Sequence, residues 1–214
     1  PSLTADPPPN THSLDTMSWF GPTFSASKCK PLLKMATLRV NIKTNKDKQV
    51  MSKAKKNIAQ LLAEKKEEKA RIRTEAVIRG DFKLEALDIL SLLCELLHER
   101  MGLLLSMKAC PPDMVEAVST LIWAAPRTEI EEFVKLAKLF KAKFGPAFFQ
   151  RAQRNSEGVV NEKIVHKLGV QPPNAFLVLN YMKQIAKSNG VDWVPTDTLD
   201  NERLNMPLPA PTGT

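Results

Sequence analysis

The sequence predicts an all-α protein, in which a long antiparallel helical hairpin has shorter helices packed against it. Apolar residues recur at steps of three and four over two long segments, the spacing of a helix with one buried face. Only 8 glycines and 1 tyrosine occur among the 214 residues, and runs of β-branched residues are few. Sandwiches, barrels and Rossmann sheets need such turn and strand formers, so this composition argues against them.

The first predicted helix spans residues 29–62. Apolar residues mark its expected buried face: Leu33, Ala36, Val40, Val50, Ala54, Ile58 and Leu61. Lys43 and Asp47 interrupt this row, so we expect the middle of the helix to be less well packed.

The second predicted helix runs from Glu67 to about Leu105 and has a wider apolar face. One row carries Ala86, Leu90, Leu93, Leu97, Met101 and Leu104, and further leucines stand at positions 87, 92, 96 and 103. A face this wide predicts neighbours on two sides. The apolar period lapses over residues 63–66, which predicts a turn and an antiparallel hairpin. One unbroken helix of about seventy residues is the alternative.

Capping residues and prolines mark the elements that follow. Asp113–Glu116 and Thr128–Glu131 both match the capping-box pattern, which predicts the starts of two helices. The first of these should end at Pro126, and the second should bend or break at Gly145-Pro146.

Two further helices complete the predicted domain. A short one is expected near residues 159–168. The last should start after Pro172-Pro173-Asn174 and stop at Asn189-Gly190, since asparagine and glycine favour helix ends. The pattern as a whole predicts six helices and no strand.

Composition divides the chain into three parts. Residues 1–27 are rich in Pro, Ser and Thr and have no apolar period, so we expect them to be disordered. Residues 28–191 form the helical domain, and residues 192–214 are expected to be a flexible, proline-containing tail. The chain opens with proline, which makes Met17 a candidate start. We expect neither a secretory signal nor a membrane span.

Positive charge is concentrated near the first helix. The whole chain has a net charge of +8, yet residues 28–73 hold 15 Lys and Arg against 4 Asp and Glu. A localised cationic surface attracts polyanions, and each Lys or Arg near an anionic leaflet is worth about 1 kcal/mol. The sequence therefore predicts an anionic membrane surface as partner, with these candidate membrane-binding residues: Lys28, Lys30, Lys34, Arg39, Lys43 and Lys46.

Two other classes of protein compete with this interpretation. A basic helical protein could bind nucleic acid, although the sequence has no helix-turn-helix spacing and few exposed aromatic residues to contact bases. A coiled-coil scaffold, a homo-oligomer indifferent to polyanions, is the third interpretation.

The sequence carries no catalytic motif, so we expect no enzyme, cofactor or metal. Cys94 and His98 are spaced to share a metal or to form a nucleophile and base, but no second pair accompanies them. We interpret them as a half-buried structural pair, and His166 as a core or surface histidine. Three cysteines without close pairing fit the reducing cytoplasm.

Several sequence blocks resemble a known family. They are residues 28–34, 69–79 and 116–127, then Val160-Asn161 with residues 166–168 and Pro172-Pro173. Their order and spacing are similar to the increased-sodium-tolerance family of ESCRT-III-like proteins, over about residues 28–192. The residues that carry the resemblance include Arg71, Arg73, Glu75, Arg79, Trp123, Pro126, Arg127 and His166.

The resemblance implies an ESCRT-III-like core and a role as an adaptor or regulator in multivesicular-body protein sorting. The implied partners are ESCRT-III subunits (charged multivesicular body proteins) and the vacuolar-sorting AAA ATPase, on endosomal membranes. Some of the same residues also have a structural interpretation. Glu75 lies four residues from Arg71 and from Arg79, which allows salt bridges, and Trp123 is of the type that anchors a core.

The tail departs from the family pattern. Members usually carry C-terminal motifs that dock on the transport domain of the ATPase. Here Asp200 and Pro207 stand where the helical version requires leucines, and burying Asp200 would be costly. The extended version leaves Met206, Pro207, Leu208 and Pro209 as candidate partner-binding residues. ATPase recruitment by this chain alone is therefore in doubt.

Overall fold

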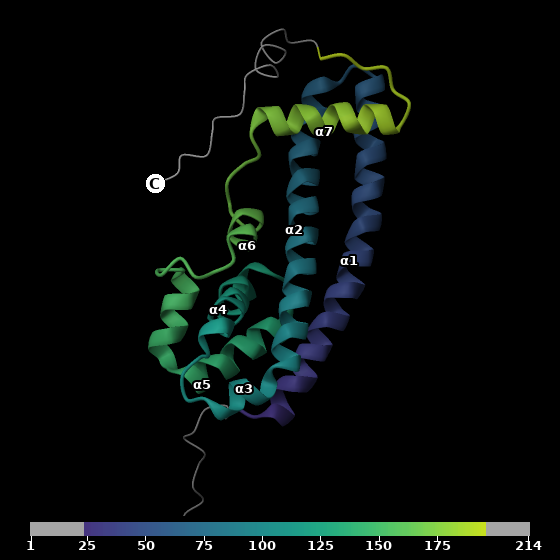
Figure 1. The fold of residues 1–214 in the computed structure, drawn as a ribbon. Helices are drawn as coiled ribbons and strands as arrows, with labels where there is room; N and C mark the ends of the chain where they lie inside the picture. Colours follow the sequence, from purple (N-terminus) through teal and green to yellow (C-terminus); the bar gives the residue numbers. More distant parts are fainter. Residues whose placement is uncertain (1–23, 196–214) are drawn as a thin grey trace, which may run out of the picture.

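A computed structural model describes residues 24–195, which form seven α-helices and two short 3₁₀-helices, without a strand in that range. Helices α1 (Ala26–Ala63) and α2 (Glu67–Glu99) lie side by side as the antiparallel hairpin (Figure 1). Lys65 takes a left-handed conformation, with φ at 59°, and the Lys66 amide donates to the Leu61 carbonyl at 2.8 Å. These contacts close the turn and confirm the hairpin over one continuous helix.

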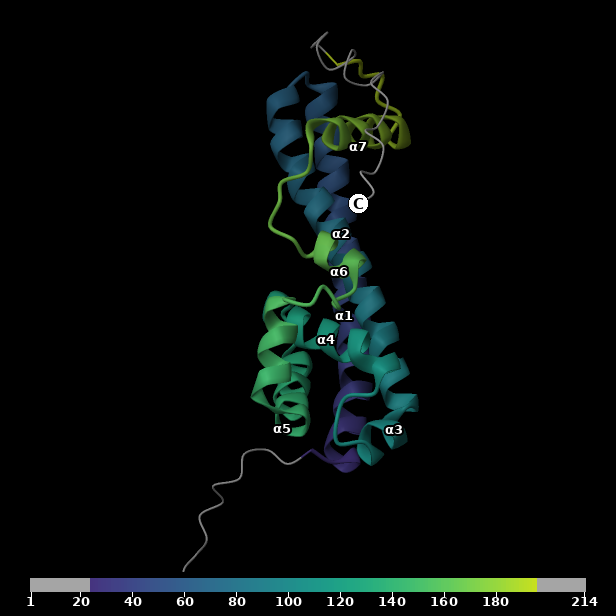
Figure 2. The same ribbon diagram turned by 60° about the vertical axis from the view of Figure 1, so that its left-hand side comes forward.

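The remaining elements pack at the two ends of the hairpin. They are α3 (Met101–Ser106), η1 (Pro112–Met114), α4 (Val115–Ala124), η2 (Ala125–Arg127), α5 (Glu131–Arg154), α6 (Glu162–Lys167) and α7 (Ala175–Ser188). Helices α3, α4 and α5 gather at the open end, and α7 crosses both long helices near the turn (Figures 1 and 2). Helix α6 lies between these groups against α2, so α2 has neighbours on two sides, as predicted.

The described residues form two separate hydrophobic clusters. The larger joins α1, α2, α4 and α5 at the open end, where Phe133 and Phe140 are fully buried. The smaller joins the turn end of the hairpin to α7, through residues such as Ile58 and Met182. No residue of α1 between Thr44 and Ile58 is buried, which confirms the looser middle.

One residue of the predicted buried row is exposed. Val50 is 49% exposed, and the neighbouring Met51 faces α2 instead. A Cβ atom on Gly80 would lie 2.4 Å from the Met51 sulfur, so the methionine fills the space above this glycine. Val50 belongs to neither of the two hydrophobic clusters, whereas Met51 packs against the smaller one.

Both predicted capping boxes are wrong. Asp113 pairs with Arg100 at 2.6 Å and η1 precedes α4, whereas the Thr128 hydroxyl donates back to the Ala124 carbonyl at 3.2 Å. Backbone turns replace the caps: the Met114 amide donates to the Pro111 carbonyl at 2.9 Å. The prolines at 112 and 126 favour these tight turns and displace the helix starts.

Other predicted interruptions are present. Gly145 has φ at 86° and divides α5 into two helical pieces ahead of Pro146. The Asn174 side chain accepts from the Leu177 amide at 2.7 Å to cap α7, and Gly190, with φ at 68°, follows its end. Arg100 separates α3 from α2, a break that the sequence did not predict.

The ordered core extends past both predicted domain boundaries. Helix α1 begins at Ala26, and the Phe24 ring packs 6.1 Å from the ring of Phe140. At the other end Trp193 packs against the cluster beneath α7. Aromatic burial thus extends the helical domain by a few residues on each side. Helix α6 is shorter than the predicted segment 159–168.

Candidate interaction surfaces

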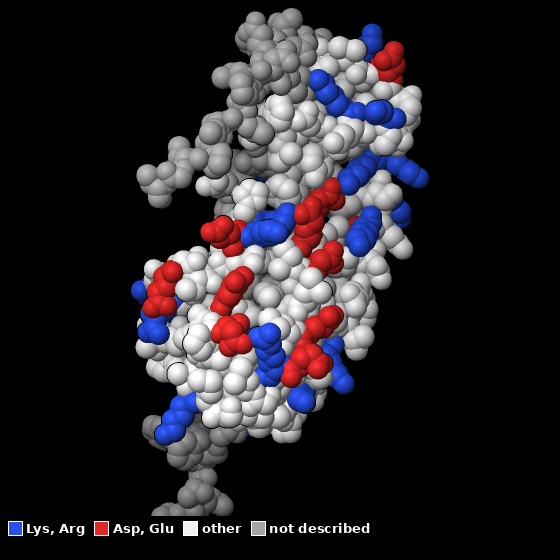
Figure 3. Space-filling view, viewed as in Figure 1, with Lys and Arg blue, Asp and Glu red and all other residues white. Residues whose placement is uncertain are grey.

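Four of the six predicted membrane-binding cations are lysines exposed at the surface of α1. Lys28, Lys30, Lys34 and Lys46 are exposed. Within the described part of the chain, Lys30, Lys34 and Lys46 make no ion pair. In Figure 3, basic side chains gather at the upper part of the edge formed by α1, whereas acidic and basic side chains alternate over α2 and α6.

The other two cations hold the fold together. Arg39 Nε donates to both carboxylate oxygens of Glu132 on α5, at 2.8 and 2.7 Å. The Glu132 side chain is only 1% exposed. A carboxylate this buried requires a charged partner, so Arg39 serves to hold α5 against α1 and not as a free cation.

Lys43 belongs to a second ion-pair group, together with Lys83 from α2. Lys43 Nζ lies 2.8 Å and Lys83 Nζ 3.0 Å from the carboxylate of Glu129, which precedes α5. Lys43 also pairs with Asp47 at 3.4 Å. Hydrogen bonds from the two lysines lower the pKa of Glu129 to about 2. The hydrogen bond that Lys43 donates to Glu129 in turn raises the pKa of Lys43.

The family residues at the start of α2 make local contacts. Arg79 pairs with Glu75 at 3.9 Å, as the spacing allowed. Arg71 pairs instead with Glu67 at 3.5 Å and with Glu68, both one turn earlier. Arg73 donates to Asn57 on α1 and so links the two long helices close to their turn. Arg73 thus supports the end of the hairpin, whereas the ion pairs of Arg71 and Arg79 lie within α2.

The block around Trp123 is structural. Trp123 is 7% exposed, and the Arg127 guanidinium lies 3.8 Å from the centre of its ring. Arg127 Nη1 also donates to the Trp123 carbonyl at 2.6 Å, and partial burial lowers the pKa of the guanidinium. Pro126 lies within η2 between them and ends α4. The prediction of a buried anchor at Trp123 is confirmed.

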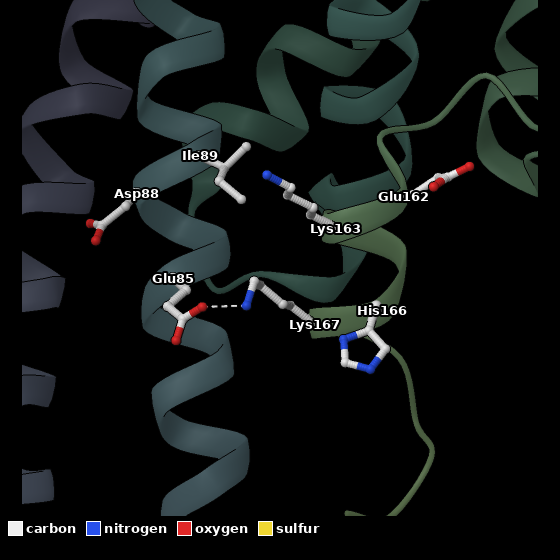
Figure 4. Close-up of a pocket in the computed structure, with 7 residues that line it drawn as sticks. All are labelled: Glu85, Asp88, Ile89, Glu162, Lys163, His166 and Lys167. Atoms are coloured by element: carbon white, nitrogen blue, oxygen red, sulfur yellow. Dashed lines mark hydrogen bonds and ion pairs between the residues drawn. The ribbon is translucent and has the colours of Figure 1, made fainter. Parts of the chain in front are cut away.

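His166 borders a cavity of about 630 Å³ between α2 and α6 (Figure 4). Lys163 and Lys167 extend from α6 toward α2, and Lys167 pairs with Glu85. His166 is exposed, and its ring lies 5.5 Å from the ring of Phe82. The interpretation of His166 as a surface histidine is confirmed.

A second cavity of about 490 Å³ adjoins the first and shares His166 and Lys167 with it. Its walls are α2, α6, the connection before α7 and the start of α7. Phe82, Val165 and Leu177 supply apolar surface, and Arg79 supplies a cation. Together the two cavities form a groove along α2, which we call the α2–α6 groove; its lining is mostly charged or polar in the first cavity and mixed apolar and polar in the second.

The pair of Cys94 and His98 has no reactive geometry. Cys94 is fully buried, and burial raises the pKa of its thiol to about 12. His98 is only partly buried, and its Nδ1 lies 3.2 Å from the carboxylate of Glu99. In residues 24–195 no three side chains are grouped to hold a metal ion, and no helix is long and apolar enough to cross a membrane. Met206, Pro207, Leu208 and Pro209 lie outside the described residues.

Sequence reasoning missed two features of these surfaces. Glu132 appears in the sequence as an ordinary first-turn acid, and nothing marks it as buried. Three apolar residues on the outer face of α1 were also missed: Met35, Leu38 and Ile42 are 48%, 62% and 71% exposed. Their spacing of three and four residues signals a second apolar row opposite the core.

The whole helical domain matches a protein family. The model of the Ist1 family, described as "Regulator of Vps4 activity in the MVB pathway", matches residues 30–192. The chain belongs to the Ist1 family. This family is the one whose blocks the sequence resembled.

Relatives and a solved structure agree with this membership. An IST1-like protein from Dictyostelium discoideum is 36% identical over 191 residues, covering 89% of this chain and 52% of its own length. Vacuolar protein sorting-associated protein IST1 from Saccharomyces cerevisiae is 32% identical, covering 81% of this chain and 60% of its own length. The chain thus spans between half and two thirds of the length of these Ist1 relatives.

The fold matches that of a solved Ist1 domain. The N-terminal domain of S. cerevisiae Ist1, crystallised in complex with the Did2 MIM motif, superposes with a TM-score of 0.74 at 28% identity. The match covers 86% of this chain and 98% of that domain. The ESCRT-III-like helical fold expected from the sequence is confirmed.

Proposed function

We propose that this chain is an ESCRT-III-associated adaptor in multivesicular-body protein sorting, which binds anionic membrane and ESCRT-III subunits and modulates the vacuolar-sorting AAA ATPase. The match of the Ist1 family over residues 30–192 carries the proposal. On the molecule itself, the exposed lysines of α1 support the membrane contact. Lys28, Lys30, Lys34 and Lys46 lie on one helix, so several can meet a flat anionic surface together.

Sedimentation with phosphatidylserine vesicles tests the membrane contact. Changing Lys30, Lys34 and Lys46 together to Glu should weaken binding at least about tenfold, because each lysine near the leaflet contributes about 1 kcal/mol. Arg39 is left intact, since its loss would release Glu132. The matched control changes three other exposed lysines, Lys108, Lys138 and Lys187, to Glu.

The control should bind as the unchanged chain does, and binding of the unchanged chain should fall as salt rises. Equal loss in both triple variants would mean that overall charge, and not α1, governs binding. Duplex DNA that displaces the chain from vesicles at physiological salt would favour the nucleic-acid class instead.

For the ESCRT-III partner, we propose that a helical C-terminal motif docks in the α2–α6 groove. The yeast Ist1 domain that shares this fold was crystallised with the Did2 MIM motif. The apolar surface of Phe82, Val165 and Leu177, next to charges of both signs, suits an amphipathic helix. Fluorescence anisotropy with a labelled MIM peptide should show binding that His166→Glu with Lys163→Glu weakens about tenfold.

Both substitutions are at exposed positions, so the fold should persist. The α1 variant with Lys30, Lys34 and Lys46 changed serves as control and should retain peptide affinity. Unchanged affinity in the His166 and Lys163 variant would place the motif elsewhere on the chain. For the ATPase, we propose residues 206–209 as the contact. Deletion of residues 206–209 should abolish any capture by its isolated transport domain.

A further inference from the structure

The outer face of α1 carries an apolar row that the fold does not use. Met35, Leu38 and Ile42 are 48%, 62% and 71% exposed. Residues three and four positions apart share a helix face, so the three side chains form one continuous row. On the opposite face, Leu33, Ala36 and Val40 are at most 1% exposed and pack in the larger cluster. The first half of α1 therefore has two apolar faces, one packed in the larger cluster and one exposed.

The charged side chains that α1 itself contributes beside this row all have the same sign. From Ala26 to Lys46, α1 contains six cations and no Asp or Glu. Arg39 and Lys43 pair with Glu132 and Glu129, and the other four cations are exposed. Lys28 and Lys46 lie on one side of the row, and Lys30 and Lys34 lie toward the other, by the 100° step of a helix. An apolar row bordered by lysines is the composition of helices that lie in the interface of an anionic bilayer.

We infer that Met35, Leu38 and Ile42 insert into the acyl boundary of an anionic bilayer while the flanking lysines contact the lipid head groups. The inference rests on the proposed membrane binding and adds a second, apolar contribution to it. Charge complementarity selects the occupant, because the exposed lysines that α1 supplies beside the row, with no carboxylate among the α1 residues there, fit a surface of anionic head groups. Head-group contact alone is screened by salt, whereas inserted side chains keep part of the binding at high salt.

Substitution of the row gives the first test, using the full chain and vesicles of phosphatidylserine and phosphatidylcholine. The variant M35S/L38S/I42S should lose at least about tenfold in binding at 0.5 M salt, given the apolar area withdrawn from the bilayer. The matched control I72S/L92S/V134S removes three exposed apolar side chains on α2 and α5. It should bind as the unchanged chain does, and circular dichroism should show that both variants remain helical.

A probe at position 38 gives the second test. L38C labelled with the fluorophore NBD should shift to the blue on vesicle binding and be quenched by nitroxide-bearing lipids, whereas K138C should do neither. Labelling is selective because Cys29 and Cys94 are buried and the pKa of the Cys110 thiol is raised to about 12.

If the chain binds vesicles but the NBD probe at position 38 shows neither the blue shift nor the quenching, the side chains do not insert. That result would overturn the inference and leave the proposed head-group binding intact. Failure of the unchanged chain to bind anionic vesicles at low salt would overturn both proposals. A second copy of this chain is the competing occupant of the row. Concentration-dependent assembly without lipid, lost in M35S/L38S/I42S, would favour that copy and contradict the inference.

Discussion

Arg39 on α1 and Glu132 on α5 form an ion pair with a bifurcated hydrogen bond. Arg39 Nε lies 2.7 and 2.8 Å from the two carboxylate oxygens. The arginine side chain is 52% exposed, whereas the glutamate is 1% exposed. The pair thus covers a buried carboxylate with a cation from another element. It joins residues 93 positions apart and ties α5 to the hairpin.

Loss of Arg39 should destabilise the fold. We expect Arg39→Ala to lower the free energy of unfolding by about 2–3 kcal/mol, because it leaves Glu132 buried without a charge partner. The expected loss of stability is smaller than is usual when a fully buried ion pair is broken, because Arg39 is half-exposed. Urea denaturation measures the change. The double variant Arg39→Ala with Glu132→Gln should recover part of the loss, and no recovery would show that the carboxylate charge is not the cause.

Stability should depend on Glu129 at acid pH. Its folded-state pKa of about 2 lies below the ordinary 4.5, so its contribution is present above pH 4.5 and is lost as pH falls toward 2. We expect Glu129→Gln to be less stable than the unchanged chain at pH 6, and the difference to shrink at pH 3. Glu129 is largely exposed, so the effect should be small and weaker in salt. A difference that is the same at both pH values would contradict the ion-pair account.

Two helical glycines should respond differently to alanine. Nothing lies within 4 Å of a Cβ at Gly102, so Gly102→Ala should stabilise the chain by about 0.5–1 kcal/mol through helix propensity. At Gly80 the new Cβ would lie 2.4 Å from the Met51 sulfur, so Met51 must move and the gain should be smaller or reversed. Thermal unfolding compares the two. Equal gains in stability at both positions would show that the Met51 side chain can move aside without destabilising the fold.

The cysteines should react slowly in the folded protein. Burial raises the pKa of the Cys29 thiol to about 11. It raises the pKa of the Cys94 thiol and that of the Cys110 thiol to about 12. Because the thiolate is the reactive form, Ellman's reagent at pH 8 should modify them only slowly. All 3 should react at once in guanidinium chloride. Fast reaction of one thiol in the folded chain would identify a less protected site.

The sequence predicted the elements better than their ends. The hairpin, the kink at Gly145 and the Asn174 cap follow from local patterns and are all present. The capping boxes at Asp113 and Thr128 failed because tight turns and an ion pair from Arg100 used the same groups differently. Such competition between partners is not visible in a local pattern.

For the surfaces, the sequence by itself determined that α1 is a long cationic helix, because lysine identity and helical spacing are local properties. Only the tertiary structure decided which cations are available. Arg39 and Lys43 face acids that belong to the distant α5 and its preceding turn, whereas Lys30, Lys34 and Lys46 face solvent. Whether a charge is neutralised depends on what packs beside it, and α5 reaches α1 only after the chain has folded back over the hairpin.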